Sequence, residues 1–574
     1  MILGIADSGS SVTKRKGLLL PGVAALAAGA VVLSLPPRVM TLPVPEDFGP
    51  TVRGAVHVHT LRSDGSGTID QVAAAAARAG LQFLVLTDHG DGTEAALGPE
   101  YRYGVLCIDG VEISSSEGHI LALGLEGRAP YPLGGEARDV VEDIARLGGM
   151  SIAAHPSSRR PELRWNDWEV PVDGLEWLNA DSEWRDESLL SLARALLTYP
   201  WRRAETLAAL LDHPVTALAA WDRLTAGRRV VAIAGSDAHA NLAPTPPAGR
   251  RGDRSLLAIP GYEAVFRAFS VHLPDLTLSG DARSDATAVV EAIRDGRLYS
   301  SIDARAAPAR LELTAQSGRH TAGPGDVLPV AGPLTVHVRT TAPPDSRLRL
   351  FKGGRAVAQG TGSRLDHRGP AEPGAYRVEV ELPGASGGQA PWLLSNPIYV
   401  GGFPPAAPAA RPPPTHVSAM AGERGWGIEK NDESLGAHEL VPLLDGRRAR
   451  LRYGLGGSIG GDVYVALGMR VPTGLADFDR VTFAGRADKP MRIWVQLWMP
   501  VPTGNRYWRR SVYLDRTIRA ITIPFDELTP VGEADPGGPL LADIESIMFV
   551  VDQVHTPVGT GGQIWIDNVA FGRQ

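Results

Sequence analysis

Lysine and cysteine are scarce in this chain, and each absence excludes a class of chemistry. No lysine occurs between Thr51 and Ala304, which excludes Schiff-base catalysis and a P-loop lysine from that region. Cys107 is the 1 cysteine, so no intramolecular disulfide can form, and its apolar surroundings predict a buried small residue. The net charge of -7, with arginines and acidic residues interspersed, disfavours a nucleic-acid polymer as partner. This charge pattern is more consistent with a small or oligomeric substrate.

Histidines and carboxylates, by contrast, recur between Val56 and Ala240, nearly always directly after a short apolar run. The positions are His57, His59, Asp64, His89, Glu112, His119, His155, Asp237 and His239. Because side chains of a strand alternate between its faces, the spacing of His57 and His59 places both imidazoles on one side, where they can bind one ion. Imidazole and carboxylate ligands suit zinc, manganese and iron alike, so the metal identity stays open.

The apolar runs predict buried parallel strands. Runs such as 81–86 and 230–234 are almost continuously apolar, as expected for strands covered on both faces. A crossover helix is predicted at 68–79, because Thr68 can cap its start and Gly80 can end it. These elements indicate an α/β barrel, in which chemistry gathers at the carboxyl ends of the strands. The candidate ligands lie at those ends.

The complete series of motifs resembles the polymerase and histidinol phosphatase (PHP) family. The matching segments are His57-Val58-His59, Ser63-Asp64-Gly65, Thr87-Asp88-His89, Glu112, Gly118-His119, Ala154-His155-Pro156 and Asp237-Ala238-His239. The resemblance covers residues 52–304 and implies a distorted, seven-stranded, TIM-like α/β barrel that holds two or three divalent metal ions.

The resemblance also implies how the ligands are divided among the ions. It assigns His57, His59 and Asp237 to one ion, Glu112 as a bridge to a second ion bound by His119 and His155, and Asp64, His89 and His239 to a third. Two bridged cations roughly 3.5–4 Å apart would acidify a shared water, and the resulting hydroxide would be the nucleophile. Among the ligands, the predicted catalytic residues are Glu112, Asp237 and His239.

The substrate class is less well defined by the sequence. A phosphoester would need arginine donors for its non-bridging oxygens, and the candidates near predicted strand ends are Arg62, Arg159, Arg160 and Arg185. The alternative is that each is solvated or ion-paired. Asp88 either orients His89 or the adjoining peptide, or it caps the turn, and the sequence leaves these interpretations open.

Six of the 12 tryptophans lie between Trp165 and Trp221, partly within a helical insertion at 183–227. These rings either border an apolar pocket roofed by the insertion or pack its helices onto the barrel. The branch of the PHP family that the chain resembles includes carbamate and ester hydrolases as well as phosphoesterases. We therefore expect a phosphoesterase acting on a phosphate monoester or nucleotide, with carbamate or carboxylic ester hydrolysis as the alternative. A non-catalytic sensor or envelope-binding protein is the alternative of another class.

The 574 residues indicate several domains. Before the PHP domain at 51–304 we expect a basic cytoplasmic tail at 1–16, an apolar segment at 17–35 and a linker at 36–50. The apolar segment is either a transmembrane anchor or a cleaved signal peptide. Both alternatives place the enzyme outside the cytoplasm, membrane-anchored or secreted.

Two β-sandwich domains are expected after the barrel. Alternating strands predict a small β-sandwich at 305–400, followed by a Pro/Ala linker at 401–415. The last domain, 416–574, is similar to jelly-roll carbohydrate-binding modules. In its run 492–498, one face mixes aromatic and hydrogen-bonding side chains: Arg492, Trp494, Gln496 and Trp498. This face either binds polysaccharide or is covered by a neighbouring sheet or domain.

Overall fold

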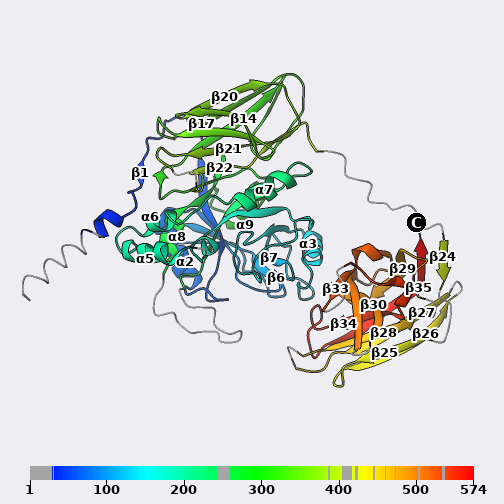
Figure 1. The fold of residues 1–574 in the computed structure, drawn as a ribbon. Helices are drawn as coiled ribbons and strands as arrows, with labels where there is room; N and C mark the ends of the chain where they lie inside the picture. Colours follow the sequence, from blue (N-terminus) through cyan, green and yellow to red (C-terminus); the bar gives the residue numbers. More distant parts are fainter. Residues whose placement is uncertain are drawn as a thin grey trace, which may run out of the picture. The chain divides into compact units, whose positions relative to one another are not determined.

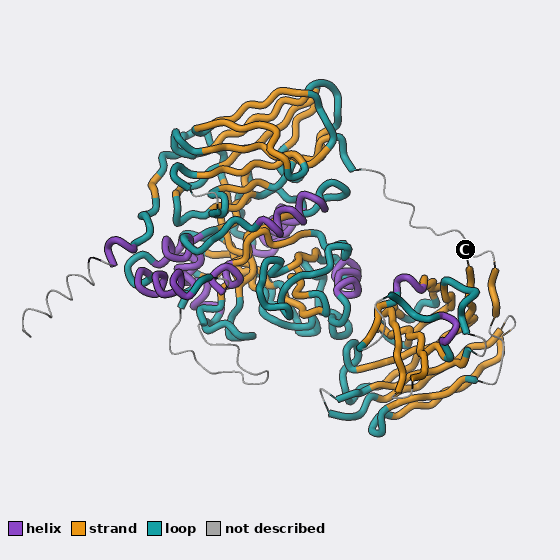
Figure 2. The backbone as a smooth tube through the Cα atoms, in the orientation of Figure 1, coloured by secondary structure: helices purple, strands orange, loops and turns teal. Residues whose placement is uncertain are grey.

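The computed structural model describes residues 29, 31–185, 187–241, 259–385, 388–403, 416–419, 425–443, 446–458, 461–471, 474–501, 504–532 and 537–573. The chain divides into two compact units. The first consists of Met1–His89, Leu97–Gly110 and Met150–Pro404, and the second of Gly90–Ala96, Val111–Gly149 and Pro405–Gln574. Figure 1 follows the elements along the chain, and Figure 2 shows that most of the helices belong to the first unit.

A parallel sheet carries the candidate ligands of the first unit. Its strands pair in the order β8 (Met150–Ala153), β9 (Gly174–Asn179), β10 (Val231–Ala238), β2 (Thr51–Val58), β3 (Phe83–Leu86) and β5 (Val105–Asp109). Every residue of β3, β8, β9 and β10 is buried, as near-continuous apolar runs predict. Because the strands are parallel, their carboxyl ends share one edge of the sheet. The seven-stranded PHP barrel itself stays a prediction.

Helix α2 (Ile69–Ala79) joins β2 to β3 and confirms the helix predicted from the sequence. The Thr68 hydroxyl accepts a hydrogen bond from the Gln71 N–H, and the Gln71 side chain accepts one from the Thr68 N–H. Gly80 ends the helix at φ 78°, a conformation that favours glycine. Val72, Ala73 and the other buried residues of α2 form one face of the helix.

The insertion predicted at 183–227 is helical. Its helices are α4 (Ala180–Arg185), which begins just before it, α5 (Leu189–Thr198), α6 (Arg203–Ala208) and α7 (Val215–Leu224). Trp221 is fully buried and donates its indole N–H to the Val230 carbonyl, so this ring packs α7 onto the sheet. Trp201 is exposed.

The sheet of the first unit continues into the segment 305–400. β11 (Ser270–Pro274) pairs antiparallel with β2 and with β12 (Tyr299–Ser301), and β12 pairs with β22 (Leu393–Ser395). From there the sheet passes through β21 (Gly374–Glu381) to β18 (Arg347–Lys352). A separate four-stranded sheet consists of β15 (His320–Ala322), β14 (Leu311–Ser317), β17 (Leu334–Thr340) and β20 (Arg364–Gly369). The two sheets give this segment a β-rich, two-layered organisation.

The remaining elements of the first unit are β1 (Met40–Thr41), β4 (Glu100–Arg102), α8 (Tyr262–Ala268), α9 (Ala282–Arg294), β13 (Ala306–Ala307), β16 (Val327–Leu328), β19 (Arg355–Thr361) and β23 (Ile398–Val400). Cys107 is buried in β5, as expected. The tail at 1–16, most of the apolar segment at 17–35 and most of the linker at 401–415 lie outside the described residues. Within the part of the chain that is described, no helix combines the length and apolarity that a membrane span requires.

The second unit combines a hairpin, a helix and a β-sandwich. The hairpin consists of β6 (Val111–Ser115) and β7 (Gly118–Leu123), and the helix is α3 (Ala137–Arg146). One sheet contains β26 (Leu435–Leu443), β27 (Gly446–Gly454), β35 (Gly561–Arg573), β29 (Arg480–Ala487) and β32 (Arg519–Pro524), with β24 (His416–Ala419) beside β35. The other contains β25 (Trp426–Lys430), β28 (Tyr464–Arg470), β34 (Ser546–Asp552), β30 (Met491–Val501), β31 (Gly504–Leu514) and β33 (Thr529–Val531). Two short 3-10 turns, Phe525–Glu527 and Leu541–Asp543, complete it.

Alternation along β30 divides its side chains between two environments. Ile493, Val495 and Leu497 lie in the core between the sheets, as the sequence pattern predicts. On the other face, the fully buried Trp494 donates its indole N–H to Asp552, and the Arg509 guanidinium lies 3.8 Å from the centre of its ring. The nearby loop at 134–135 comes close as well, because a Cβ at Gly135 would lie 3.4 Å from the Trp494 ring.

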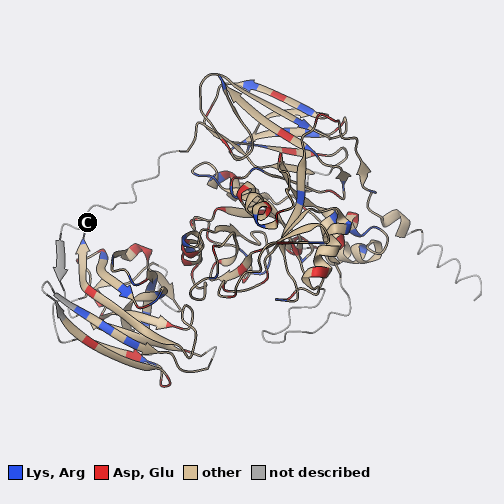
Figure 3. Ribbon diagram, turned by 180° about the vertical axis from the view of Figure 1, so that it is seen from behind, with Lys and Arg blue, Asp and Glu red and all other residues tan. Residues whose placement is uncertain are grey.

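This face of β30 is therefore covered at Trp494. Of the two alternatives drawn from the sequence, the covered face describes this position. Trp498 is half-buried and donates to Gln496. Polysaccharide binding by the domain stays a prediction. Figure 3 shows basic and acidic positions interspersed along the ribbon of both units, in keeping with the charge pattern of the sequence.

Candidate metal centre

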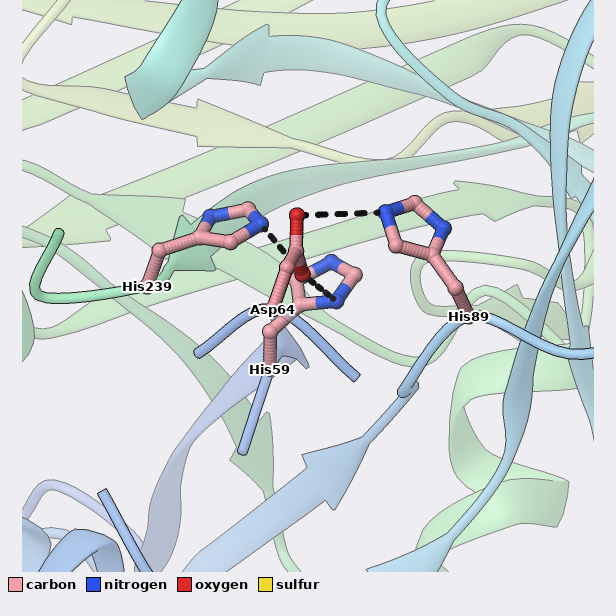
Figure 4. Close-up of side chains that lie close together, drawn as sticks. All are labelled: His59, Asp64, His89 and His239. Atoms are coloured by element: carbon pink, nitrogen blue, oxygen red, sulfur yellow. Dashed lines mark ion pairs between the residues drawn. The ribbon is translucent and has the colours of Figure 1, made fainter. Parts of the chain in front are cut away.

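Asp64 lies among three imidazoles (Figure 4). Its Oδ1 atom is 3.2 Å from His239 Nε2 and 3.4 Å from His59 Nδ1, and its Oδ2 atom is 3.6 Å from His89 Nε2. The His59 and His239 rings stack with their centres 4.1 Å apart. The four side chains come from segments that follow β2, β3 and β10, and they are close enough together to hold one metal ion.

The electrostatics of this cluster favour positive charge. Burial alone would raise the pKa of Asp64, but hydrogen bonds with His239 and His89 outweigh it and hold the pKa well below its ordinary value. Burial likewise opposes protonation of His239, yet the carboxylates of Asp237 and Asp64 raise its pKa to about 10. A carboxylate pair that draws protons onto neighbouring imidazoles equally attracts a divalent cation, which displaces those protons.

A second cluster gathers around Asp237. Its Oδ1 atom lies 3.3 Å from the Nε2 atoms of both His57 and His59, and these two nitrogens are 3.1 Å apart. Its Oδ2 atom is 3.4 Å from His155 Nδ1. Asp237 Oδ1 is buried and accepts no hydrogen bond that the structure describes, although two ring nitrogens face it. This arrangement fits three ligand atoms directed at one ion.

Burial opposes ionisation of Asp237, but the positive charges of His57 and His155 hold its pKa well below the ordinary range. His239 Nδ1 lies 2.9 Å from the Asp237 carbonyl oxygen, so its ring is oriented with Nε2 toward Asp64. The backbone of this region is also unusual. His57, His155 and Asp237 have φ values of 69°, 51° and 43°, which non-glycine residues rarely adopt. Such strain is typical of functional sites.

The left-handed conformation of His57 corresponds to a register irregularity in the sheet. Val56 pairs with Val85, and Val58 pairs with Leu86, so His57 is the extra residue of β2. The alternation argument therefore predicts the correct outcome, convergence of His57 and His59, although the strand is not regular at this point.

Glu112 and His119 lie in the second unit, on the β6–β7 hairpin. In its register Ser114 is opposite His119 and Glu112 is opposite Leu121, so Glu112 and His119 share one face. Glu112 Oε1 is 2.7 Å from His119 Nδ1, and the Ser114 hydroxyl is 3.3 Å from His119 Nε2. Both Glu112 and His119 are buried. Their role as metal ligands stays a prediction.

Asp88 caps a turn. It accepts hydrogen bonds from the Thr60 N–H (2.7 Å) and hydroxyl (2.8 Å) and from the Ser63 N–H (3.2 Å) and hydroxyl (2.7 Å). The turn leads directly to Asp64, so Asp88 positions that residue. Whether Asp88 also orients His89 stays a prediction.

The predicted substrate-binding arginines occupy different environments. Arg62 forms a bidentate pair with Asp109, with N–O distances of 2.6 and 3.2 Å. Arg185 pairs with Asp181 and lies 4.3 Å from the centre of the Trp184 ring. Arg159 is exposed and Arg160 is half-buried. Ion pairing is thus observed for Arg62 and Arg185, and substrate binding by all four stays a prediction.

The insertion lies beside this centre. Asp237 and His239 are among the residues that line a small hollow, which is partly open to solvent. Trp184, Leu207 and Leu210 are among the residues that line the rest. An apolar group bound near the candidate metal centre would contact these side chains.

Sequence reasoning missed Glu176, which lies inside the apolar run of β9. Its Oε1 atom is 2.6 Å from His57 Nδ1, and its Oε2 atom accepts hydrogen bonds from the His155 N–H (2.9 Å) and the Asn179 amide (2.8 Å). A charged residue inside a buried strand is rare unless it is paired, and that was the available signal.

Two curated proteins resemble short parts of the chain. Over 83 residues, or 13% of the chain, it is 40% identical to a phosphoribosyl 1,2-cyclic phosphate 1,2-diphosphodiesterase of Eggerthella lenta, covering 32% of that protein. Over 108 residues, or 18% of the chain, it is 32% identical to an uncharacterized protein of Methanocaldococcus jannaschii, covering 62% of it. The chain thus spans less than two thirds of each relative. No family model matches.

Parts of the chain also resemble solved structures, among them the following two. A candidate metal-dependent phosphoesterase from Bifidobacterium adolescentis is 14% identical, with 35% of this chain and 91% of that chain covered and a TM-score of 0.23. A family 11 carbohydrate-binding module from Clostridium thermocellum is 17% identical, with 28% and 95% covered and the same TM-score of 0.23. At these values neither likeness carries a functional argument.

Proposed function

We propose that this chain is a metal-dependent phosphoesterase of the PHP type that hydrolyses a phosphate monoester or a nucleotide. The observation that carries the proposal is the position of Asp237 Oδ1, 3.3 Å from Nε2 of both His57 and His59. The sequence similarity to a phosphodiesterase supports phosphorus as the centre attacked. The absence of lysine between Thr51 and Ala304 is consistent with chemistry based on metal ions rather than on an amine nucleophile.

In this proposal the described clusters have separate roles. His57, His59 and Asp237 hold one ion, and Asp64, His89 and His239 hold another. The family resemblance assigns His119 and His155 to a further ion, with Glu112 as the bridging carboxylate. When bound, such ions supply an activated water and polarise the ester. The chain's own contribution is to orient the ligand atoms, for example through the contact between His239 Nδ1 and the Asp237 carbonyl oxygen.

The hollow beside Asp237 favours a second candidate function, hydrolysis of carbamates or carboxylic esters with an apolar group. Trp184, Leu207 and Leu210 would contact that group. We also propose that the enzyme acts outside the cytoplasm, because the segment at 17–35 is apolar and follows a basic cluster.

A substrate panel separates the two candidates. The chain from about Pro45 onward should be assayed, after elemental analysis, with nucleotide and sugar phosphates beside aryl carbamates and esters. We expect phosphate release that His59→Ala abolishes and that His337→Ala, an exposed histidine of β17, leaves unchanged. Hydrolysis of carbamates or esters alone would support the second candidate.

A purified protein without metal and without any activity would contradict both enzymatic proposals. In that case the non-catalytic alternative predicts that His59→Ala leaves the physiological effect of the protein intact.

A further inference from the structure

Glu176 is a fully buried carboxylate in the middle of β9, and both of its oxygens are occupied. Oε1 faces His57 Nδ1 at 2.6 Å, while Oε2 accepts the N–H of His155. His57 Nδ1 is on the side of the ring opposite Nε2, the nitrogen that faces Asp237. Glu176 therefore contacts the His57 ring on the side that faces away from Asp237. Among the described residues it belongs to none of the groups that could hold a metal ion.

The adjacent strand makes room for this carboxylate. Gly235 lies on β10, which pairs with β9, and a Cβ at this position would be 1.6 Å from Glu176 Oε1 and 2.4 Å from its Cδ. Any side chain at residue 235 would collide with the carboxylate. The Glu176 carboxylate is buried and hydrogen-bonded, so it cannot move aside as the end of an exposed side chain could. Glu176 can therefore occupy its position only because residue 235 is a glycine.

We propose that Glu176 is a positioning residue for His57 and His155, and that Gly235 provides the space it needs; this inference rests on the proposed metal-dependent function. By accepting the Nδ1 proton of His57, the carboxylate selects the tautomer whose Nε2 lone pair faces Asp237 and His59. Its other oxygen holds the backbone of His155, which has a left-handed φ of 51°. One carboxylate thus orients two predicted ligands, one on β2 and the other just after the end of β8.

The test compares metal affinity among Glu176→Gln, Glu176→Ala and the unaltered chain, using competition with a chelator and elemental analysis. Losing a partner of this kind typically weakens metal binding about 10–100-fold. We expect the larger loss for Ala and a smaller loss for Gln, because Gln keeps one oxygen acceptor. Glu372→Gln, an exposed carboxylate paired with Lys352, is the matched control and should bind metal normally.

A double-variant cycle tests the role of Gly235. Gly235→Ala should weaken metal binding in the unaltered background, since the added methyl displaces Glu176. In the Glu176→Ala background the same change should have little further effect, because the group that it displaces is gone. Equal losses from Gly235→Ala in both backgrounds would overturn the assignment of Gly235.

These outcomes are separable from failure of the proposed function. If the unaltered chain binds no metal, the proposed function is wrong and the positioning role falls with it. If the unaltered chain binds metal and Glu176→Ala binds it equally tightly, the positioning role is wrong and the proposed function stands. Circular dichroism and the Tm of the metal-free variants show whether a loss of affinity reflects unfolding; a loss seen only in unfolded protein would also contradict the proposal.

Discussion

Arg492 and Asp143 are 349 residues apart in the chain and are joined by two hydrogen bonds, from Nε to Oδ2 at 2.8 Å and from Nη2 to Oδ1 at 3.0 Å. Both side chains are buried, with 0% and 3% exposed. Asp143 belongs to α3, whose first residue, Ala137, donates its N–H to Glu117 in the β6–β7 hairpin. The β-sandwich is thus connected through α3 to the hairpin that carries two of the predicted metal ligands.

Arg492→Ala is expected to destabilise the second unit strongly. The substitution leaves Asp139 and Asp143 buried without one of their cations, and breaking a buried ion pair typically costs about 3–5 kcal/mol. Denaturant unfolding measures the free energy of unfolding. The control is Arg519→Ala, because Arg519 is about half exposed and its pair with Asp515 is of the kind worth about 1 kcal/mol or less. Equal decreases in the free energy of unfolding for the two variants would show that the buried ion pairs of Arg492 add no more to stability than an exposed pair does.

Trp494→Ala is expected to act on stability. Its ring is fully buried, and removing a buried aromatic side chain typically costs about 3–5 kcal/mol. Affinity electrophoresis in gels containing polysaccharide, run beside unfolding measurements, distinguishes the two alternatives for this face. A variant that folds with normal stability and loses retardation by a polysaccharide would instead support the sugar-binding interpretation.

Asp237→Asn is expected to reduce both metal content and activity. An amide keeps the size of the side chain but loses the negative charge that faces His57 and His59. The loss should exceed the 10–100-fold typical of residues that only orient a ligand. Elemental analysis and phosphate release are the measurements, with His337→Ala as control. Full metal content in Asp237→Asn would remove this residue from the ligand set.

The metal-free chain is expected to lose stability as the pH rises. The pKa of His239 is raised from 6.5 to about 10 in the folded protein. The protonated His239 therefore adds its full share to the free energy of unfolding below pH 6.5, and this share is lost as the pH increases toward 10. The lowered pKa of Asp64 affects stability at acidic pH. The ionised Asp64 adds to the free energy of unfolding above pH 3.8, and this stabilisation is lost as the pH falls below that value.

The Tm of chelator-treated protein measured against pH tests this expectation. Added metal should remove the decline between pH 6.5 and 10, because a bound cation takes the place of the proton on His239. His239→Asn should flatten the same part of the profile in the metal-free protein. A Tm that is independent of pH in that range without metal would contradict the arrangement of charges around His239.

Local signals were sufficient for part of the fold. The start and end of α2 depend on Thr68, Gln71 and Gly80, which are near neighbours in the chain, so the sequence predicted this helix correctly. The burial of β3 and β10 also follows from their own apolar composition. For the candidate site, residue type and spacing identified the imidazoles and carboxylates, and the structure brings those of the first unit into two clusters.

Other relationships depended on residues far apart in the chain. Glu176 and His57 are 119 residues apart, and no pattern around either residue indicates its partner. Arg492 is likewise paired with Asp143 of α3, which lies far from it in the chain. The left-handed backbone of His57 accompanies an irregular pairing of β2 with β3. The sequence by itself determined which groups can ligate metal and which local turns form. Only the tertiary structure decided which carboxylate orients which imidazole and which aromatic face is covered, because those contacts form when distant strands and helices pack together.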